Sequence, residues 1–199
     1  MNSNSLSRYC VIITTAILLS TPVLAQQNTG YYIGASVGQS KTSIDAAPYA
    51  AIGAVVTKSD DSNSAFRIFG GYQLTNYLGI EASYVDLGAF GASGTIGAAG
   101  FSATGDVNGV SLTGIGTLPL GQKVSLLGNA GVFFSKVKAT ASVGTIPGSA
   151  KDDDTDITAG IGLKYDLSKN VAARLDATYY GLGDNGNAKL YSLGLQYKF

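Results

Sequence analysis

The side chains of this sequence that could do chemistry are few, and the missing types are informative. The chain has no histidine and one cysteine, Cys10, which lies in a segment that we expect to be cleaved off. Most hydrolytic and acyl-transfer sites use histidine as the general base, and thiol chemistry needs cysteine. An ordinary catalytic triad or dyad is therefore excluded, and we predict that the protein is not an enzyme.

Two short motifs resemble ligand loops. The glycines of 181–186 have the G-x-G-x-x-G spacing of a dinucleotide loop, but that loop must open a helix, and here another strand follows. Asp152, Asp154 and Asp156 begin like a calcium loop, yet Ile157 and Leu163 stand where that loop needs Gly and Glu. We interpret the glycine motif as a hairpin turn and the aspartate motif as a solvated acidic loop. We expect no cofactor and no metal.

The number and placement of charged residues limit the possible ligands and chemistry further. Lys and Arg together number 13, as do Asp and Glu, so the net charge is zero, which gives no sign of nucleic acid binding. A carboxylate pair could act without histidine, but Asp166 and Asp176 each have a cation beside them in the sequence. Six charged residues instead share one face of alternating segments, where they could form an ion-pair network: Arg67, Glu81, Lys164, Asp166, Arg174 and Asp176.

Eight segments alternate apolar with polar or small residues, which is typical of β-strands. Each is close to the 9–11 residues that a tilted strand needs to cross a bilayer. They cover residues 31–40, 65–74, 77–87, 107–118, 124–138, 156–167, 171–180 and 192–199.

The connections between these segments are sorted by length. Those at 75–76, 119–123 and 168–170 are short, whereas those at 41–64, 88–106 and 139–155 are long, and only 182–187 breaks the rule. An even strand number with short turns on one side and long loops on the other is the layout of an outer-membrane barrel.

The apolar faces of the segments are rich in tyrosine near the strand ends, where a membrane interface would hold the ring in lipid and the hydroxyl in water. The alternative is a soluble barrel that binds an apolar ligand inside and turns the six charges toward water. The tyrosines are Tyr31, Tyr72, Tyr77, Tyr84, Tyr165, Tyr179, Tyr191 and Tyr197.

Sequence signals at both ends of the chain indicate that the protein is exported from the cytoplasm. At the start, Arg8 precedes the apolar run 11–19, and Val23 and Ala25 precede a cleavage point, which predicts a signal peptide over residues 1–25. The final strand resembles the C-terminal recognition signal of bacterial outer-membrane barrels and implies periplasmic chaperones and the barrel-assembly machinery as partners. Its matching residues are Ser192, Gly194, Tyr197 and Phe199.

Together these features resemble the OmpA-like family of small outer-membrane barrels, which includes OmpX and the neisserial opacity-type proteins. The resemblance covers about residues 28–199 and implies an all-β, transmembrane, eight-stranded antiparallel up-and-down barrel at 26–199. It implies the outer membrane of a Gram-negative bacterium as location, and we expect a monomer. The peptidoglycan-binding domain of full-length OmpA has no counterpart here, so we do not expect a cell-wall tether.

The resemblance implies a structural or surface role, with adhesion or contact to a host ligand through the outer loops. Because an eight-stranded barrel has room only for side chains, we expect a filled lumen and no open pore. A narrow channel for small solutes or ions is the alternative. The alternation places Lys136 and Lys138 on the lipid-facing side of their strand, near the outer rim. Both are candidates for contact with lipopolysaccharide.

The terminal aromatic residue provides a direct test of these expectations. Deleting Phe199 should reduce the amount of folded protein in the outer membrane, because the assembly signal would end without its last aromatic ring. The measurement is the heat-dependent gel shift of the folded barrel in isolated outer membranes. A normal level of folded protein would contradict the assignment of residues 192–199 as an assembly signal.

Overall fold

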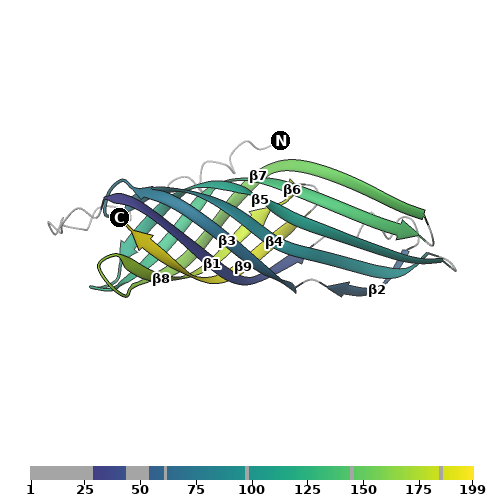
Figure 1. Cartoon of the computed structure of the whole chain (residues 1–199), viewed down its shortest axis with the longest axis horizontal. Helices are drawn as coiled ribbons and strands as arrows, with labels where there is room; N and C mark the ends of the chain where they lie inside the picture. The colour runs from purple at the N-terminus through teal and green to yellow at the C-terminus, as the bar shows by residue number, and fades with distance from the viewer. Residues whose placement is uncertain (1–28, 44–53, 61, 97–98, 144–145, 184–185) are drawn as a thin grey trace, which may run out of the picture.

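The computed structural model describes residues 29–43, 54–60, 62–96, 99–143, 146–183 and 186–199 (Figure 1). The predicted signal peptide lies outside these residues and stays a prediction. Within the described ranges, no helix combines the length and the apolar character that crossing a bilayer would require. The secondary structure of these residues is almost entirely strand.

The strands form one antiparallel sheet, and consecutive barrel strands pair with each other. Their bounds are β1 Gly30–Ser43, β2 Ala54–Asp60, β3 Ser62–Gln73, β4 Leu78–Ile96, β5 Ala99–Pro119, β6 Val124–Val143, β7 Ile146–Asp166, β8 Val171–Gly181 and β9 Asn187–Lys198.

Pairing of the first strand with the last closes the sheet into a barrel. β1 lies between β3 and β9, and β4 pairs with both β3 and β5, so the hydrogen-bonded ring includes every described strand except β2. β2 pairs with β4 beyond the ring. Closure leaves no free edge inside the lipid, where water cannot satisfy backbone N–H and C=O groups. The predicted closed, eight-stranded antiparallel barrel is confirmed.

The two faces of the barrel wall differ as the alternation predicts. Large apolar side chains project outward and are exposed, for example Val37 at 68%, Ile161 at 66% and Leu193 at 61%. Such a continuous apolar exterior suits lipid and would be unfavourable in water. Aromatic pairs such as Tyr31–Tyr72 and Tyr197–Phe199 lie at the end of the barrel with the short turns, which we take as the periplasmic end.

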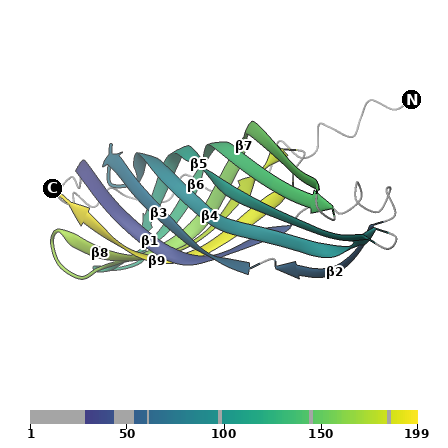
Figure 2. The same ribbon diagram turned by 45° about the vertical axis from the view of Figure 1, so that its right-hand side comes forward.

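Four strands on one side of the barrel extend far beyond the others (Figures 1 and 2). β7 pairs with β8 only over residues 158–166, so residues 146–157 rise beyond that contact, about 40 Å along the strand at about 3.3 Å per residue. β4, β5 and β6 continue beside β7, and β2 pairs with the outer part of β4. Much of the segments 41–64, 88–106 and 139–155, predicted as loops, is therefore strand.

Candidate functional site

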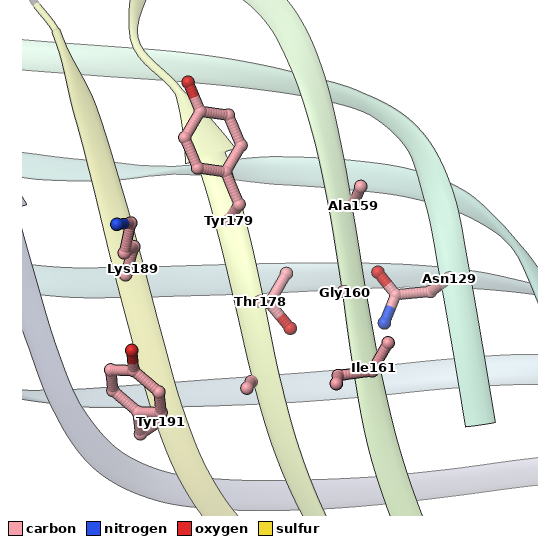
Figure 3. A pocket seen from close by; sticks show the side chains of 9 residues that line it. Asn129, Ala159, Gly160, Ile161, Thr178, Tyr179, Lys189 and Tyr191 are labelled. Carbon is pink, nitrogen blue, oxygen red and sulfur yellow. The ribbon is translucent and has the colours of Figure 1, made fainter. Parts of the chain in front are cut away.

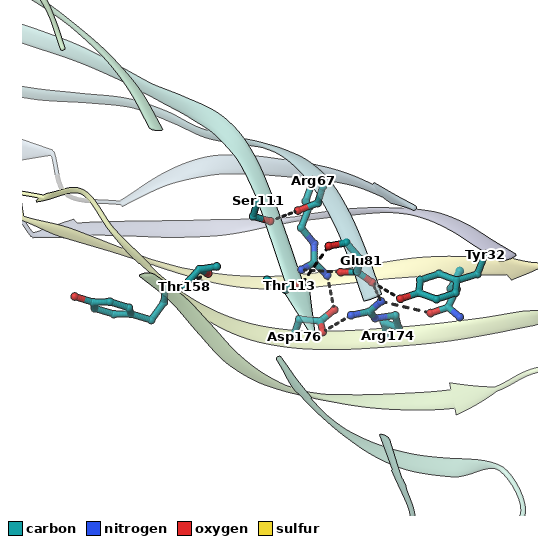
Figure 4. Close-up of polar contacts among 11 residues, drawn as sticks. Tyr32, Arg67, Glu81, Ser111, Thr113, Thr158, Arg174 and Asp176 are labelled. Atoms are coloured by element: carbon teal, nitrogen blue, oxygen red, sulfur yellow. Dashed lines mark hydrogen bonds and ion pairs between the residues drawn. The ribbon is translucent and has the colours of Figure 1, made fainter. Parts of the chain in front are cut away.

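Four charged side chains meet in the middle of the lumen and form a closed ring of ion pairs (Figure 4). Arg174 on β8 donates to Glu81 on β4 at 2.7 Å and to Asp176 at 3.0 Å. Arg67 on β3 donates to Asp176 at 3.0 Å and lies 3.9 Å from Glu81. Each cation thus contacts both anions, and the ring is neutral. We call these four residues the lumenal charge ring.

Neighbouring side chains complete the surroundings of the charge ring. The hydroxyl of Tyr32 donates to Glu81 at 3.1 Å. The ring of Phe69 lies 4.9 Å from the guanidinium carbon of Arg67 and 4.5 Å from that of Arg174, which is cation–π distance. All four charged side chains are at most 4% exposed. Their carboxylates are held by cations, so neither is free to act as a general base.

The other two charged residues of the predicted network lie apart from the charge ring. Lys164 and Asp166 pair with each other at 3.2 Å near the periplasmic end of β7, with side chains 21% and 38% exposed. The six predicted residues therefore divide into a buried ring of four and a separate pair that is open to solvent.

The outer part of the lumen is filled by apolar side chains, which the sequence interpretation missed. The rings of Phe133 and Tyr180 are in contact, with centroids 4.7 Å apart and planes tilted by 57°, and Val85 and Phe133 are fully buried. We call this cluster the apolar layer. It consists of Ala65, Val85, Leu87, Val107, Phe133, Val137, Tyr180, Leu182, Ala188 and Leu190.

A sequence signal for the apolar layer does exist, because the alternation inverts at the outer rim. On β6, Lys136 and Lys138 project outward and are exposed, while Val137 between them projects inward and is buried. On β5, Asp106 is exposed and Val107 buried in the same way. Beyond the lipid the outer face meets water, so charge moves outside and apolar side chains pack inside.

The two motifs that resemble ligand loops meet each other at this rim. The backbone N–H of Gly183 donates to a carboxylate oxygen of Asp156 at 3.0 Å. A side chain at Gly183, whose φ is +58°, would overlap Asp154, and one at Gly181 would overlap Asp156. The glycines therefore make room for carboxylates that hold the β8–β9 connection against β7. Among the described residues, no cluster of His, Cys, Asp and Glu could hold a metal ion.

The residues of the terminal motif lie along β9, between β8 and β1. Ser192 is buried on the lumenal face, and a side chain at Gly194 would overlap the backbone of β1. Tyr197 projects outward, and the backbone N–H of Phe199 donates to the carbonyl oxygen of Tyr31 at 3.1 Å. The last residue thus joins the closing seam of the barrel, while its role in assembly stays a prediction.

The charge ring allows a stability test by partner removal. Arg174→Met should lower the free energy of unfolding by about 3–5 kcal/mol, because it leaves two buried carboxylates with only Arg67. The double variant Arg174→Met/Asp176→Asn should lose less, since Arg67 and Glu81 then remain as a neutral pair. Urea titration of the folded protein in lipid vesicles, followed by gel shift, measures both.

The exposed pair supplies the matched control for this test. Lys164→Met should change the free energy of unfolding by at most about 1 kcal/mol, because its pair with Asp166 is partly solvated. A loss for Arg174→Met as small as that for Lys164→Met would contradict the importance of the buried ring.

Comparison with known proteins agrees with this architecture. The family model described as "Outer membrane protein beta-barrel domain" matches residues 11–199. Outer membrane protein A of Serratia marcescens is 30% identical over 140 residues, which cover 66% of this chain and 38% of that protein. The protein of the same name from Klebsiella pneumoniae is 27% identical over 141 residues, covering 66% and 40%. The matches thus span about two fifths of these relatives.

Solved structures show the same fold at low identity. Ail, the attachment invasion locus protein of Yersinia pestis, in complex with the heparin analogue sucrose octasulfate, superposes with a TM-score of 0.57 at 19% identity, covering 86% of this chain and 99% of Ail. Neisserial surface protein A gives a TM-score of 0.53 at 19% identity, covering 85% and 97%. With its closed barrel and the match over residues 11–199, the chain belongs to the outer membrane protein β-barrel domain family and resides in the outer membrane of Gram-negative bacteria.

Proposed function

We propose that this protein works at the cell surface, where it supports the outer membrane and contacts outside molecules through strands that stand above the barrel. The observation that carries the proposal is the sheet formed by the described residues of 54–60, 88–106 and 139–157, which we call the projecting sheet (Figure 2). Outer loops and edges of a rigid barrel are common places for binding. The proposal includes no catalysis and no cofactor.

The projecting sheet has a strand edge that can take another strand. Over residues 146–157, β7 pairs with β6 on one side and with no described strand on the other. Unpaired N–H and C=O groups at such an edge can bind an extended segment of a partner. Near the rim this edge is blocked, because the N–H groups of Thr155 and Ile157 donate to Asp154 and Asp156 at 2.7 and 2.6 Å. The open stretch therefore lies farther out.

Charge indicates what such a partner would be. Residues 151–156 carry Asp152, Asp153, Asp154 and Asp156 against one cation, Lys151. Ail is named with a heparin analogue, a polyanion, which an acidic strand of this kind would repel. We therefore assign the projecting sheet to contacts with neutral or basic protein segments, including those of a host surface.

The lumen supports a closed barrel as part of the same proposal. The charge ring fills the middle of the barrel, and the apolar layer fills its outer part with side chains that are at most 8% exposed. A narrow channel would need a continuous polar path, and the apolar layer offers ions no partners. We infer that the barrel carries no steady ion current.

The membrane and assembly partners complete the proposal. Lys136 and Lys138 are exposed on the outer wall and offer contacts to lipopolysaccharide phosphates. Asp153 on β7 stands opposite Lys136, whereas Lys138 stands between Asp106 on β5 and Lys151 on β7. We assign recognition by periplasmic chaperones and the barrel-assembly machinery to the terminal strand, and we propose that the protein acts as a monomer.

Shortening the projecting sheet tests the surface role. Replacing residues 91–104 and 140–149 each with an Asn-Gly turn removes the outer hairpins and leaves paired strands below them. Cells that carry the shortened protein should be retained on an epithelial monolayer at the background level, while cells with the full protein are retained above it. Gel shift checks that both forms reach the outer membrane folded. Equal retention of the two would contradict the proposal.

Planar-bilayer recording tests the closed lumen. The folded protein should give no steady current, and Phe133→Ala/Tyr180→Ala should give current, because both rings belong to the apolar layer and are its largest side chains. Phe134→Ala is the matched control, since Phe134 is the outward neighbour and is 48% exposed. Steady current through the unaltered barrel would favour the channel alternative.

A further inference from the structure

The outer part of β7 has a neighbouring strand on one side only. Where β7 crosses the barrel wall, Ala159 and Gly160 stand opposite Tyr179 and Thr178 on β8 (Figure 3). Over residues 146–157, β6 alone pairs with β7 among the residues that the structure describes. A strand edge therefore stands above the rim, and its backbone groups are placed to pair with another chain.

The direction of the backbone groups along β7 follows from its lower end. The N–H of Asp166 donates to the carbonyl oxygen of Lys123, just before β6, at 2.8 Å. From Tyr165 to Ile146 the register between β6 and β7 runs without a shift. Because alternate residues of a strand direct their N–H and C=O groups to opposite sides, even-numbered residues of β7 face β6. Odd-numbered residues face the side that is open above the rim.

Only part of the open edge offers N–H donors to a partner. Near the rim, the N–H groups of Thr155 and Ile157 donate to the carboxylates of the aspartates before them. At the outer end stands Pro147, which has no N–H. The donors that remain are those of the odd-numbered residues within 149–153. We call residues 149–153 the pairing window.

The pairing window carries two opposite charges on the outer face of the sheet. The side chains of Lys151 and Asp153 are exposed, and residues two apart on a strand share one face. On β6, Lys151 faces Lys138 and Asp153 faces Lys136. An added strand would place one residue directly opposite each charge, where opposite charges stabilise the pairing and like charges destabilise it. The window therefore favours an acidic residue opposite Lys151 and a basic residue opposite Asp153.

A second copy of this chain does not fit the pairing window. Copies in one membrane have the same orientation, so two β7 edges related by a two-fold axis would pair in parallel. That pairing places Lys151 opposite Lys151 and Asp153 opposite Asp153, which is destabilising. A segment of another protein has no such restriction and can run antiparallel to β7, the direction in which strand pairing is slightly more stable.

We propose that the pairing window binds an extended segment of another protein with the pattern base–x–acid–x–polar, in order from its amino end. The segment runs antiparallel to β7, with its basic residue opposite Asp153, its acidic residue opposite Lys151 and its uncharged residue opposite Ser149. Backbone hydrogen bonds hold the segment, and the two charges determine its sequence. This inference rests on the proposed surface role and names the kind of segment that the projecting sheet binds.

Three capped peptides test the pattern, by fluorescence polarisation with the full-length folded protein in lipid nanodiscs. T-K-T-E-T-T has the proposed pattern, whereas T-K-T-K-T-T and T-E-T-E-T-T each oppose one window charge with a like charge. The first should bind about 5-fold more tightly than either of the others. Attraction to overall charge would instead place its affinity between theirs, which would overturn the proposal. Binding of none of them at about 1 mM would also overturn it.

A protein variant and a modified peptide test the contacts themselves. Lys151→Glu/Asp153→Lys should prefer T-E-T-K-T-T to T-K-T-E-T-T, the reverse of the unaltered protein. A preference of the unaltered protein for T-E-T-K-T-T would overturn the antiparallel direction. Methylating the backbone nitrogen of the glutamate in T-K-T-E-T-T should abolish binding, because that N–H faces β7. Methylation of the preceding threonine is the control, and equal losses would contradict strand pairing. Gel shift verifies that the variant is folded.

Two comparisons separate this inference from its alternatives. Ser149→Cys places a thiol in the pairing window, and a disulfide-linked dimer in outer membranes would show that a second copy occupies the edge and overturn the proposal. Cell retention without peptide selection would contradict this inference alone. Peptide selection without cell retention would contradict the proposed surface role alone.

Discussion

The barrel wall is one residue thick, and lipid on its outer side cannot hydrogen bond to the backbone. Every strand inside the membrane must therefore have two neighbours, which the pairing of β1 with β9 achieves for the two ends of the chain. The same thickness ties each side chain to one of two environments, because neighbours along a strand face opposite sides. A register slip of β1 by one residue against β9 would place Ser36 in lipid and Val37 in the lumen. Closure and side-chain placement are thus fixed together.

The lumen meets this constraint with two kinds of packing. The charge ring links the neighbouring strands β3 and β4 to β8, which lies apart from both in the sheet, through contacts that a slip of one of these strands would break. Buried ion pairs add little net stability, since desolvation offsets the attraction, but they penalise wrong registers strongly. The apolar layer supplies what the ring lacks, because burying Phe133, Leu87 and Leu190 is favourable in itself. We attribute register to the ring and much of the stability of the outer barrel to the layer.

The sequence alone could predict which face each charged residue occupies but not which residues meet. Arg67 and Asp176 are 109 positions apart, and their contact depends on how the closed sheet brings β3 opposite β8. The alternation of side chains along the strands also could not show that Lys164 and Asp166 lie apart from the other four charged residues, since all six face inward. The apolar layer was missed for another reason. Val85, Phe133 and Val137 break the rule of a polar interior, and the rule applies only where lipid lies outside. The strand extensions were missed because segments such as 88–106, rich in Gly, Ala and Ser, show no alternation strong enough to predict a strand.

The uneven height of the wall divides the barrel surface into two regions with different neighbours. On the side of β1, β8 and β9 the strands end close to the level of Tyr179 and Tyr191, which is where exterior tyrosines of a barrel meet the membrane interface. On the side of β4 to β7 the strands continue into water, where the alternation inverts and aspartates and lysines face outward together. Mixed charge and an open strand edge suit contact with other proteins. Both features lie on the side of β4 to β7, where the strands are longer. The difference in strand length therefore separates lipid contact from protein contact on one small barrel.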